Sequence, residues 1–226
     1  MKTKFLIVNL VLALLILVGD VCYITLGGLL IKGLTSAGFV VLGAVNLLYL
    51  ILNKDKDLKF PIIMLIGLFF AMLGDIVLNI YFIGGAILFA VGHVFYFVSY
   101  CMLNKFSVKD LLYGALIFVP AVLFITLAPI FDFGGVLMEI VCVIYAIIIS
   151  CMVGKAIANL VKERTVLNII LVVGSALFFF SDLMLLLNVF ANLGRVVDIL
   201  CLATYYPAQI LLAYSITKNI NKKSGN

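Results

Sequence analysis

Long apolar stretches alternate along this chain with short polar interruptions, and the interruptions divide it into eight apolar runs. The runs lie near residues 5–25, 33–52, 60–80, 86–103, 111–128, 135–153, 166–188 and 195–217. A helix needs about 20 residues to cross a bilayer core about 30 Å thick, and each run is close to that length. The pattern predicts an all-α integral membrane protein, a single domain over residues 1–226 that forms an eight-transmembrane-helix bundle.

The composition excludes a soluble domain and a transmembrane barrel. Of the 226 residues, 66% are hydrophobic and 11% are charged, and the mean hydropathy is +1.36. So few polar residues cannot cover the surface of a globular domain. A barrel strand alternates apolar and polar residues over about ten positions, whereas the runs here are continuous. The first run resembles a secretory signal but continues past Gly19 and Asp20 without a cleavage site, so we expect it to remain as a helix.

The basic residues predict how the bundle is oriented. Of the 15 lysine and arginine residues, 13 fall at the two termini or in the loops on the same side as the termini. The other two, Lys32 and Arg195, fall on the opposite side. Because basic loops stay in the cytoplasm, we expect both termini to be cytoplasmic and the protein to be a multi-pass component of the cell membrane. The net charge of +5 is explained by this orientation signal, so we expect no nucleic-acid partner.

Two aspartates stand inside apolar runs, Asp75 in LFFAMLGDIVLNI and Asp182 in SALFFFSDLMLLLN. A charged residue at the centre of a membrane helix costs about 2.5–3.5 kcal/mol on insertion scales, so such residues mark candidate functional sites. From the helical rise, both aspartates and the single histidine, His93, lie roughly 9–11 Å below the non-cytoplasmic surface. Three further acids lie nearer to that surface: Asp20, Glu139 and Asp198. We therefore expect a shared polar cavity that opens to the non-cytoplasmic side.

The surroundings of the two aspartates share a sequence pattern. Segments 74–78 and 181–185 each have a small residue, an aspartate, two apolar residues and a leucine. They fall on the third and seventh runs, which cross the membrane in the same direction, so a parallel duplication of four helices is one interpretation. The pattern indicates that the two carboxylates approach one depth from similar helix surfaces.

Motifs of several enzyme classes are absent from the chain. It has no GxxxxGK[ST], no GxSxG, no HExxH and no CxxC, and its five cysteines are scattered over four of the runs. We expect no cofactor and no metal, because a zinc site would have only His93 and carboxylates as ligands. Two aspartates in a pocket of low dielectric can instead differ in proton affinity, so that one acts as a general acid and the other as a general base. Such pairs cleave acetal-like bonds.

Four short motifs carry a resemblance to a known family. They are GDIVL at 74–78, GHVFY at 92–96, GSALFFFSDL at 174–183 and YPAQ at 206–209. In this order they resemble the YhhN-like family, the lysoplasmalogenases, and the resemblance extends over nearly the whole chain. Lys32 in IKGLT also matches, although Gly33 stands where members often have a proline.

The resemblance implies an activity and a set of site residues. Family members hydrolyse the vinyl ether of lysoplasmalogens, which gives a fatty aldehyde and a glycerophospho-ethanolamine or glycerophosphocholine. Asp75 and Asp182 would then share acid and base catalysis, with His93 hydrogen-bonded to a carboxylate or placing water. Lys32 would attract the phosphate of the lysophospholipid substrate.

Two further residues complete the expected site. Tyr96 shares a helical face with His93, and Gln209 lies on the polar face of the last run, so we expect both to hold the headgroup side of the substrate. Interhelical hydrogen bonds are the alternative role of such residues in membrane helices. A proton-coupled transporter of a small molecule or a lipid is the alternative function, because buried acids also serve as proton relays.

Overall fold

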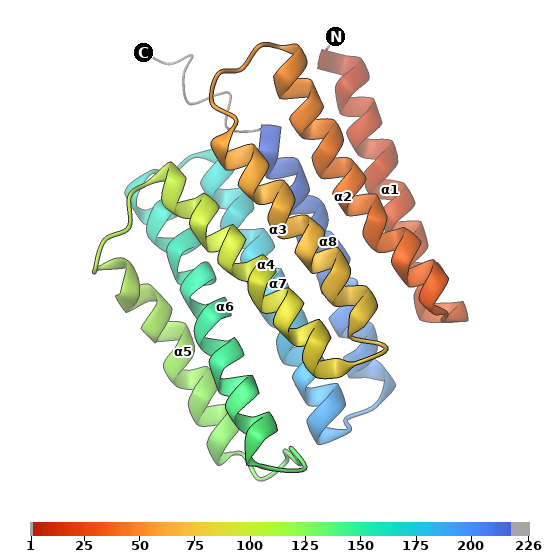
Figure 1. Ribbon diagram of the computed structural model, residues 1–226, viewed down its shortest axis with the longest axis vertical. Helices are drawn as coiled ribbons and strands as arrows, with labels where there is room; N and C mark the ends of the chain where they lie inside the picture. The colour runs from red at the N-terminus through yellow and green to blue at the C-terminus, as the bar shows by residue number, and fades with distance from the viewer. Residues whose placement is uncertain (1, 218–226) are drawn as a thin grey trace.

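A computed structural model describes residues 2–217 of the chain, and these residues form eight α-helices (Figure 1). The helices are α1 (Lys2–Leu26), α2 (Leu29–Leu52), α3 (Lys59–Val77), α4 (Phe82–Leu103), α5 (Asp110–Leu127), α6 (Val136–Lys162), α7 (Val166–Ala191) and α8 (Arg195–Ser215). The predicted fold class is confirmed. Lys218, Lys222 and Lys223, which entered the charge count, lie outside the described residues.

The helices pass back and forth between two ends of the bundle. We call the end where α1 begins the N-terminal end, and the other the far end. The connections α1–α2, α3–α4, α5–α6 and α7–α8 lie at the far end (Figure 1). Each described helix is long and apolar enough to cross a membrane, which makes the chain a multi-pass membrane protein.

Two predicted boundaries are wrong in ways that matter for the charges. The second run predicts a helix from residue 33, but α2 begins at Leu29, so Lys32 lies inside the helix and is 6% exposed. The sixth run predicts a helix that ends near residue 153, but α6 continues to Lys162 and contains the buried Lys155. The sequence places both lysines in loops because an unpaired ammonium is costly inside a membrane. Each has a carboxylate partner from another helix, which removes that objection.

Six of the helices form a closed ring and two lie outside it. Going around the ring, α2 packs on α3, α3 on α4, α4 on α6, α6 on α7, α7 on α8, and α8 on α2. Helix α1 packs outside against α2 and α8, and the backbone of α5 packs against α6 alone among the described helices. Figure 1 shows α1 and α5 at opposite flanks of the bundle.

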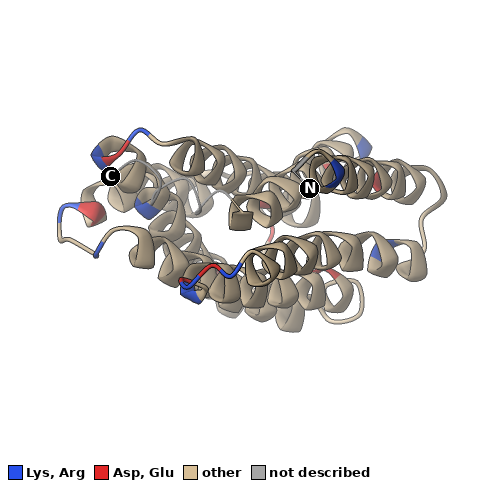
Figure 2. Cartoon of the chain, turned by 90° about the horizontal axis from the view of Figure 1, so that it is seen from above, with Lys and Arg blue, Asp and Glu red and all other residues tan. Residues whose placement is uncertain are grey.

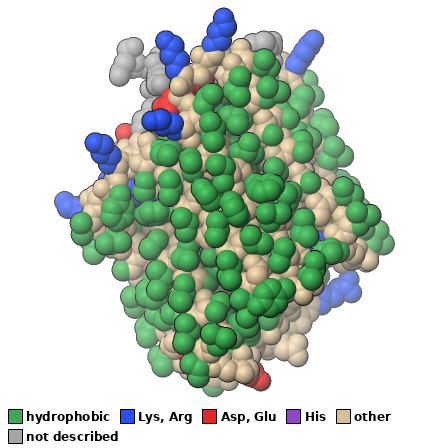
Figure 3. All heavy atoms as spheres, in the orientation of Figure 1, with side chains coloured by type: hydrophobic (Ala, Val, Ile, Leu, Met, Phe, Trp, Pro, Cys, Tyr) green, Lys and Arg blue, Asp and Glu red, His purple; other side chains and the backbone are tan. Residues whose placement is uncertain are grey.

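The outer surface suits a lipid environment. Hydrophobic side chains cover the middle of the face shown in Figure 3, and most of the basic side chains visible there lie toward its upper part. Seen from above, lysine and arginine lie mainly in loops and at helix ends (Figure 2). Leucines on α1 such as Leu10 and Leu15 are each 61% exposed, as expected for side chains that face hydrocarbon rather than water.

Close packing and hydrogen bonds fill the half of the ring near the N-terminal end. The amide of Asn159 donates to the backbone oxygen of Tyr100 at 2.8 Å, and the Tyr100 hydroxyl lies 2.9 Å from the hydroxyl of Ser175. All three side chains are fully buried. Asn168 in turn donates to the backbone oxygen of Asn159 at 3.1 Å. These bonds join α4, α6 and α7, so this half of the ring is packed.

Candidate active site

Asp75 lies near the far end of α3 and is held by side chains from two neighbouring helices. The Lys32 ammonium on α2 lies 3.0 Å from Asp75 Oδ1, and both side chains are buried. The hydroxyls of Ser36 on α2 and Tyr206 on α8 both donate to Asp75 Oδ2, Tyr206 from 3.1 Å. A buried carboxylate is tolerated when it is paired with a cation and its remaining lone pairs accept hydrogen bonds. Asp75 meets both conditions, because Lys32 supplies the cation and two hydroxyls bond to Oδ2.

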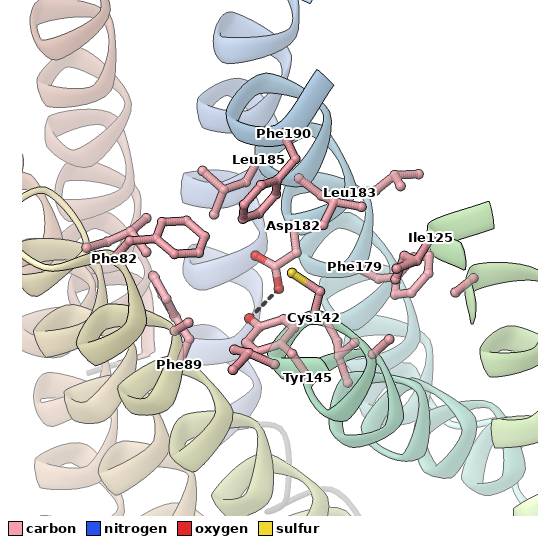
Figure 4. A pocket seen from close by; sticks show the side chains of 17 residues that line it. Phe82, Phe89, Ile125, Cys142, Tyr145, Phe179, Asp182, Leu183, Leu185 and Phe190 are labelled. Atoms are coloured by element: carbon pink, nitrogen blue, oxygen red, sulfur yellow. Dashed lines mark hydrogen bonds between the residues drawn. The ribbon is translucent and has the colours of Figure 1, made fainter. Parts of the chain in front are cut away.

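Asp182 on α7 has a different set of neighbours. The Tyr145 hydroxyl on α6 donates to Asp182 Oδ2 at 2.7 Å (Figure 4). His93 Nε2 on α4 lies 2.8 Å from the Tyr145 hydroxyl and 3.3 Å from Asp182 Oδ2. His93 is fully buried, and its Nδ1 has no hydrogen-bond partner among the described residues. No lysine or arginine in residues 2–217 forms an ion pair with Asp182. The two aspartates therefore differ in the charge around them.

The two sites are built on the same plan. Asp75 on α3 takes its partners from α2 and α8, and Asp182 on α7 takes its partners from α6 and α4. A shift of four helices converts α2, α3 and α8 into α6, α7 and α4, and the packing of α2 on α8 becomes that of α6 on α4. This correspondence agrees with the parallel duplication indicated by segments 74–78 and 181–185. The plan is shared, whereas the chemistry of the partners is not.

Both carboxylates face one cavity of about 220 Å³. Lys32 and Asn79 line it beside Asp75, and Asn188 and Asp198 line it on the side of α7 and α8. Asn79 Nδ2 donates to the Asp75 backbone oxygen at 2.7 Å, and its Oδ1 lies 3.5 Å from the Lys32 ammonium. The cavity thus has a polar wall that continues toward the far end of the bundle.

A second, smaller pocket of about 90 Å³ lies on the other side of Asp182 (Figure 4). Its walls come from α3 to α7 and are almost entirely apolar, and they include Phe82, Phe89 and Phe190. The polar residues among its lining are Asp182 and Tyr145. Asp182 lines both spaces and therefore stands where a polar cavity meets an apolar one.

Of the other residues that the sequence selected, Tyr96 and Gln209 lie outside both spaces, and Lys32 lies on the cavity wall. The Tyr96 hydroxyl donates to Gln209 Oε1 at 3.0 Å, both side chains are fully buried, and neither lines the two spaces. The pair links α4 to α8. Lys32 does line the cavity, but it is also the ion-pair partner of Asp75.

Sequence reasoning missed three residues that contact the aspartates. Tyr145, Ser36 and Tyr206 were not selected as site residues because a single hydroxyl in an apolar helix carries no spacing signal. Tyr206 belongs to the YPAQ motif and could have been found there. Tyr145 and Ser36 have no such motif, and only the packing of α6 on α7 and of α2 on α3 places them beside a carboxylate.

The fold and the site define a class, a multi-pass helical membrane protein with two unlike carboxylates in one intramembrane cavity. A sequence model of the YhhN family matches residues 35–216, which include Asp75, His93 and Asp182. The chain therefore belongs to the YhhN family. Neither a search of curated proteins nor a search of solved structures found a match.

Proposed function

We propose that this protein hydrolyses the vinyl ether bond of a lysoplasmalogen and releases a fatty aldehyde and a glycerophospho-ethanolamine or glycerophosphocholine. The observation that carries the proposal is the pair of carboxylates on one cavity, one in an ion pair with a lysine and the other beside a tyrosine hydroxyl and an imidazole. Membership of the YhhN family agrees with this activity. A vinyl ether joins a polar glycerol to an apolar chain, which matches a catalytic group at the junction of a polar and an apolar space.

Asp182 supplies the proton in this mechanism. Hydrolysis begins when a proton adds to the vinyl carbon on the chain side, which leaves an oxocarbenium ion at the carbon bonded to oxygen. The carbon that receives the proton lies on the side of the hydrocarbon chain, and Asp182 is the carboxyl that borders the apolar pocket. A carboxyl group in apolar surroundings can be kept protonated so that it acts as a general acid.

Asp75 serves as the charged partner. Its carboxylate stabilises the oxocarbenium ion and takes a proton from the water that attacks the cation, which gives a hemiacetal. When the hemiacetal collapses, Asp75 returns this proton to the glycerol oxygen and Asp182 takes the proton of the hemiacetal hydroxyl. The products are an aldehyde and a glycerol hydroxyl, and both carboxyl groups return to their starting states.

His93 and Tyr145 position Asp182. With His93 neutral and protonated on Nε2, the ring donates to the Tyr145 oxygen while Tyr145 donates to Asp182. In this arrangement the unpartnered Nδ1 carries no proton. Leaving this acceptor without a partner costs less free energy than burying a protonated imidazolium whose Nδ1–H has no acceptor. The chain of bonds fixes the carboxyl in one orientation without adding positive charge beside it.

Lys32 contributes on the headgroup side. It holds Asp75 ionised and, on the cavity wall, attracts the phosphate of the substrate. The distribution of basic residues supports a cavity that faces the non-cytoplasmic leaflet. A single-chain lipid in that leaflet would have its ether bond just below the headgroups, close to the depth of the two aspartates.

A proton-coupled transporter is the second candidate, because buried acids also serve as relays. A transport path needs polar groups through both halves of the bundle. Here the half near the N-terminal end is packed by Tyr100, Asn159 and Ser175, which bond to one another or to the backbone. This packing favours the hydrolase.

The test measures aldehyde release by the purified protein in detergent with a lysoplasmalogen as substrate. We expect Asp75→Asn and Asp182→Asn each to lower kcat by at least about a hundredfold, because general acid–base catalysis contributes roughly 10²–10⁴. Asp20→Asn should cost much less, since Asp20 is buried on α1 but lines neither space. Normal turnover in both cavity variants would exclude the mechanism. Solute movement in liposomes without aldehyde release would favour the transporter.

Two tyrosine substitutions distinguish a role of the Tyr145 hydroxyl in catalysis from a role in packing alone. Tyr145→Phe removes the hydroxyl that donates to Asp182, and Tyr100→Phe removes a hydroxyl bonded to Ser175 in the packed half. Tyr145→Phe loses two buried hydrogen bonds, to Asp182 and with His93, and Tyr100→Phe loses one, each worth about 1 kcal/mol of stability. We expect turnover to fall about tenfold or more in Tyr145→Phe and to stay near the wild-type value in Tyr100→Phe.

A further inference from the structure

The apolar pocket and the polar cavity adjoin each other. Five residues line both: Leu78, Phe82, Phe89, Asp182 and Leu185. A molecule that spans the two spaces would pass the Asp182 carboxyl with a polar part on one side and an apolar part on the other. The apolar side is closed by groups that offer no hydrogen bonds, such as Ile125 and Phe179. A hydrocarbon chain is the occupant that these apolar walls suit best.

Helix α5 forms the outer wall of this pocket and is joined to α6 by ion pairs and a close backbone contact toward the N-terminal end. At the N-terminal end, the buried Asp110 carboxylate pairs with Lys155 at 2.6 Å and with Lys162 at 2.8 Å. One turn further, Gly154 packs so closely on α5 that a Cβ atom there would lie 2.4 Å from Gly114 N. These contacts join α5 to α6 while the pocket lies beyond them, toward the far end.

Toward the far end, side chains lie between α5 and the ring helices. Ala121 and Ile125 line the pocket from α5, and Phe179 and Phe190 line it from α7. Figure 4 shows Ile125 close to Phe179. The backbone of α5 packs on no described helix except α6, and Ala121 and Ile125 are the α5 side chains that line the pocket. The width of the pocket therefore depends on the residues at positions 121 and 125.

We propose that this pocket binds the hydrocarbon chain of a single-chain phospholipid next to the scissile bond, and that Ala121 and Ile125 on α5 determine which chains are accepted. The inference rests on the proposed function for the identity of the headgroup and the bond that is cleaved. The binding of a chain in the pocket does not depend on cleavage. Continuity with the polar cavity through Asp182 is what identifies the occupant as one lipid molecule with a headgroup and one chain.

A fluorescence experiment tests occupancy without using the reaction. The chain has no tryptophan, so a single introduced tryptophan is the only one in the protein. Phe179→Trp places the indole in the pocket wall, and Phe180→Trp places it next along α7, where the side chain is 39% exposed and lines neither space. The probe is an ester-linked lysophosphatidylcholine with bromine atoms on its chain, titrated into protein in detergent.

We expect saturable quenching of the indole fluorescence in the Phe179→Trp variant, reversed by unlabelled lysophosphatidylcholine, and only weak, non-saturable quenching in the Phe180→Trp variant. The ester-linked probe has no vinyl ether, so binding is measured whether or not the protein is a hydrolase. Equal, non-saturable quenching in the two variants would overturn the proposal, because the chain would then be bulk detergent or lipid around the helices.

A second experiment tests selectivity. Ala121→Phe narrows the pocket, whereas Leu123→Phe adds a similar ring at a side chain that is 50% exposed on the lipid-facing side of α5. We expect Ala121→Phe to lower kcat/KM for a long-chain lysoplasmalogen about tenfold or more relative to a short-chain one, because each methylene that loses its site costs about threefold to fourfold. Leu123→Phe should keep the wild-type ratio.

The outcomes distinguish the two proposals. Saturable quenching without any aldehyde release would leave the chain pocket standing and remove the proposed hydrolysis. Aldehyde release by the wild type, combined with unchanged chain preference in Ala121→Phe, would support the hydrolysis and remove the role of α5 in selectivity.

Discussion

Asp75 and Asp182 are the same residue type at similar positions in their helices, and their neighbours make them different. Lys32, Ser36 and Tyr206 surround Asp75 with one positive charge and two hydroxyl donors. Asp182 has one tyrosine hydroxyl and one imidazole. A carboxylate stays ionised where a cation and donors stabilise the charge, and this contrast is the physical basis of the proposed division between base and acid.

The ion pair between Lys32 and Asp75 predicts an asymmetric effect on stability. Lys32→Met leaves the Asp75 carboxylate buried without its cation, which should destabilise the protein by about 3 kcal/mol or more. The double variant Lys32→Met/Asp75→Asn removes both charges and should recover much of this loss. Thermal unfolding in detergent measures the stability of the wild type, of Lys32→Met and of the double variant.

Activity should follow a different order from stability. The double variant should remain inactive although it is folded, because the proposed base is gone. Equal destabilisation in Lys32→Met and in the double variant would show that the pair contributes little to holding the fold.

At the scale of elements, the pairing of α5 with α6 depends on one contact between backbones. Gly154 meets Gly114 and the backbone of Tyr113 with no space for a side chain. Small residues at such contacts let membrane helices approach closely, and dispersion forces between the backbones then stabilise the pair. The ion pairs of Asp110 lie at the same end, so both features fix α5 where the pocket does not reach.

A pair of glycine substitutions tests this contact. Alanine is a better helix former than glycine by about 1 kcal/mol, so helix propensity alone predicts that Gly154→Ala and Gly33→Ala both stabilise. A Cβ at Gly33 would meet only Ile76, at 3.7 Å, whereas a Cβ at Gly154 would lie 2.4 Å from backbone. We expect Gly154→Ala to lower the melting temperature by several degrees and Gly33→Ala to leave it unchanged or raised. Equal shifts would mean that α5 moves aside without cost.

At the scale of the whole molecule, each of the six ring helices supplies at least one site residue. Lys32, Asp75, His93, Tyr145, Asp182 and Tyr206 come from α2, α3, α4, α6, α7 and α8 in turn. The correspondence between the two halves explains why the carboxylates reach one cavity, since each half delivers its aspartate by the same helix pairing. The two outer helices have other roles, and α5 walls the apolar pocket.

The orientation of the bundle is open to a direct measurement. The basic residues predict that the far end faces away from the cytoplasm. Leu193→Cys places a thiol in the α7–α8 connection, where the native side chain is 52% exposed, and Lys56→Cys places one in the α2–α3 connection, which is also exposed. A membrane-impermeant maleimide added to intact cells should label Leu193→Cys, and Lys56→Cys only after the cells are broken. The wild type, whose five cysteines all lie within helices, gives the background. The reverse labelling would put the cavity in the cytoplasmic leaflet.

The sequence by itself determined the class and the number of helices, and it predicted the depth of the two aspartates. These follow from local quantities, because a bilayer requires about 20 apolar residues per helix and each residue advances the helix by about 1.5 Å. The ordered motifs that resembled the YhhN-like family were also sufficient to identify the family, as the match over residues 35–216 confirms.

Only the tertiary structure decided which groups lie beside each aspartate. Lys32 is 43 positions from Asp75 in the chain, and Tyr145 is 37 positions from Asp182, so no spacing rule connects them. Their contacts result from the way α2 packs on α3 and α6 on α7. For the same reason the sequence placed Lys32 and Lys155 in loops. A lysine is too costly to bury alone, and its partner becomes visible only when the helices are assembled.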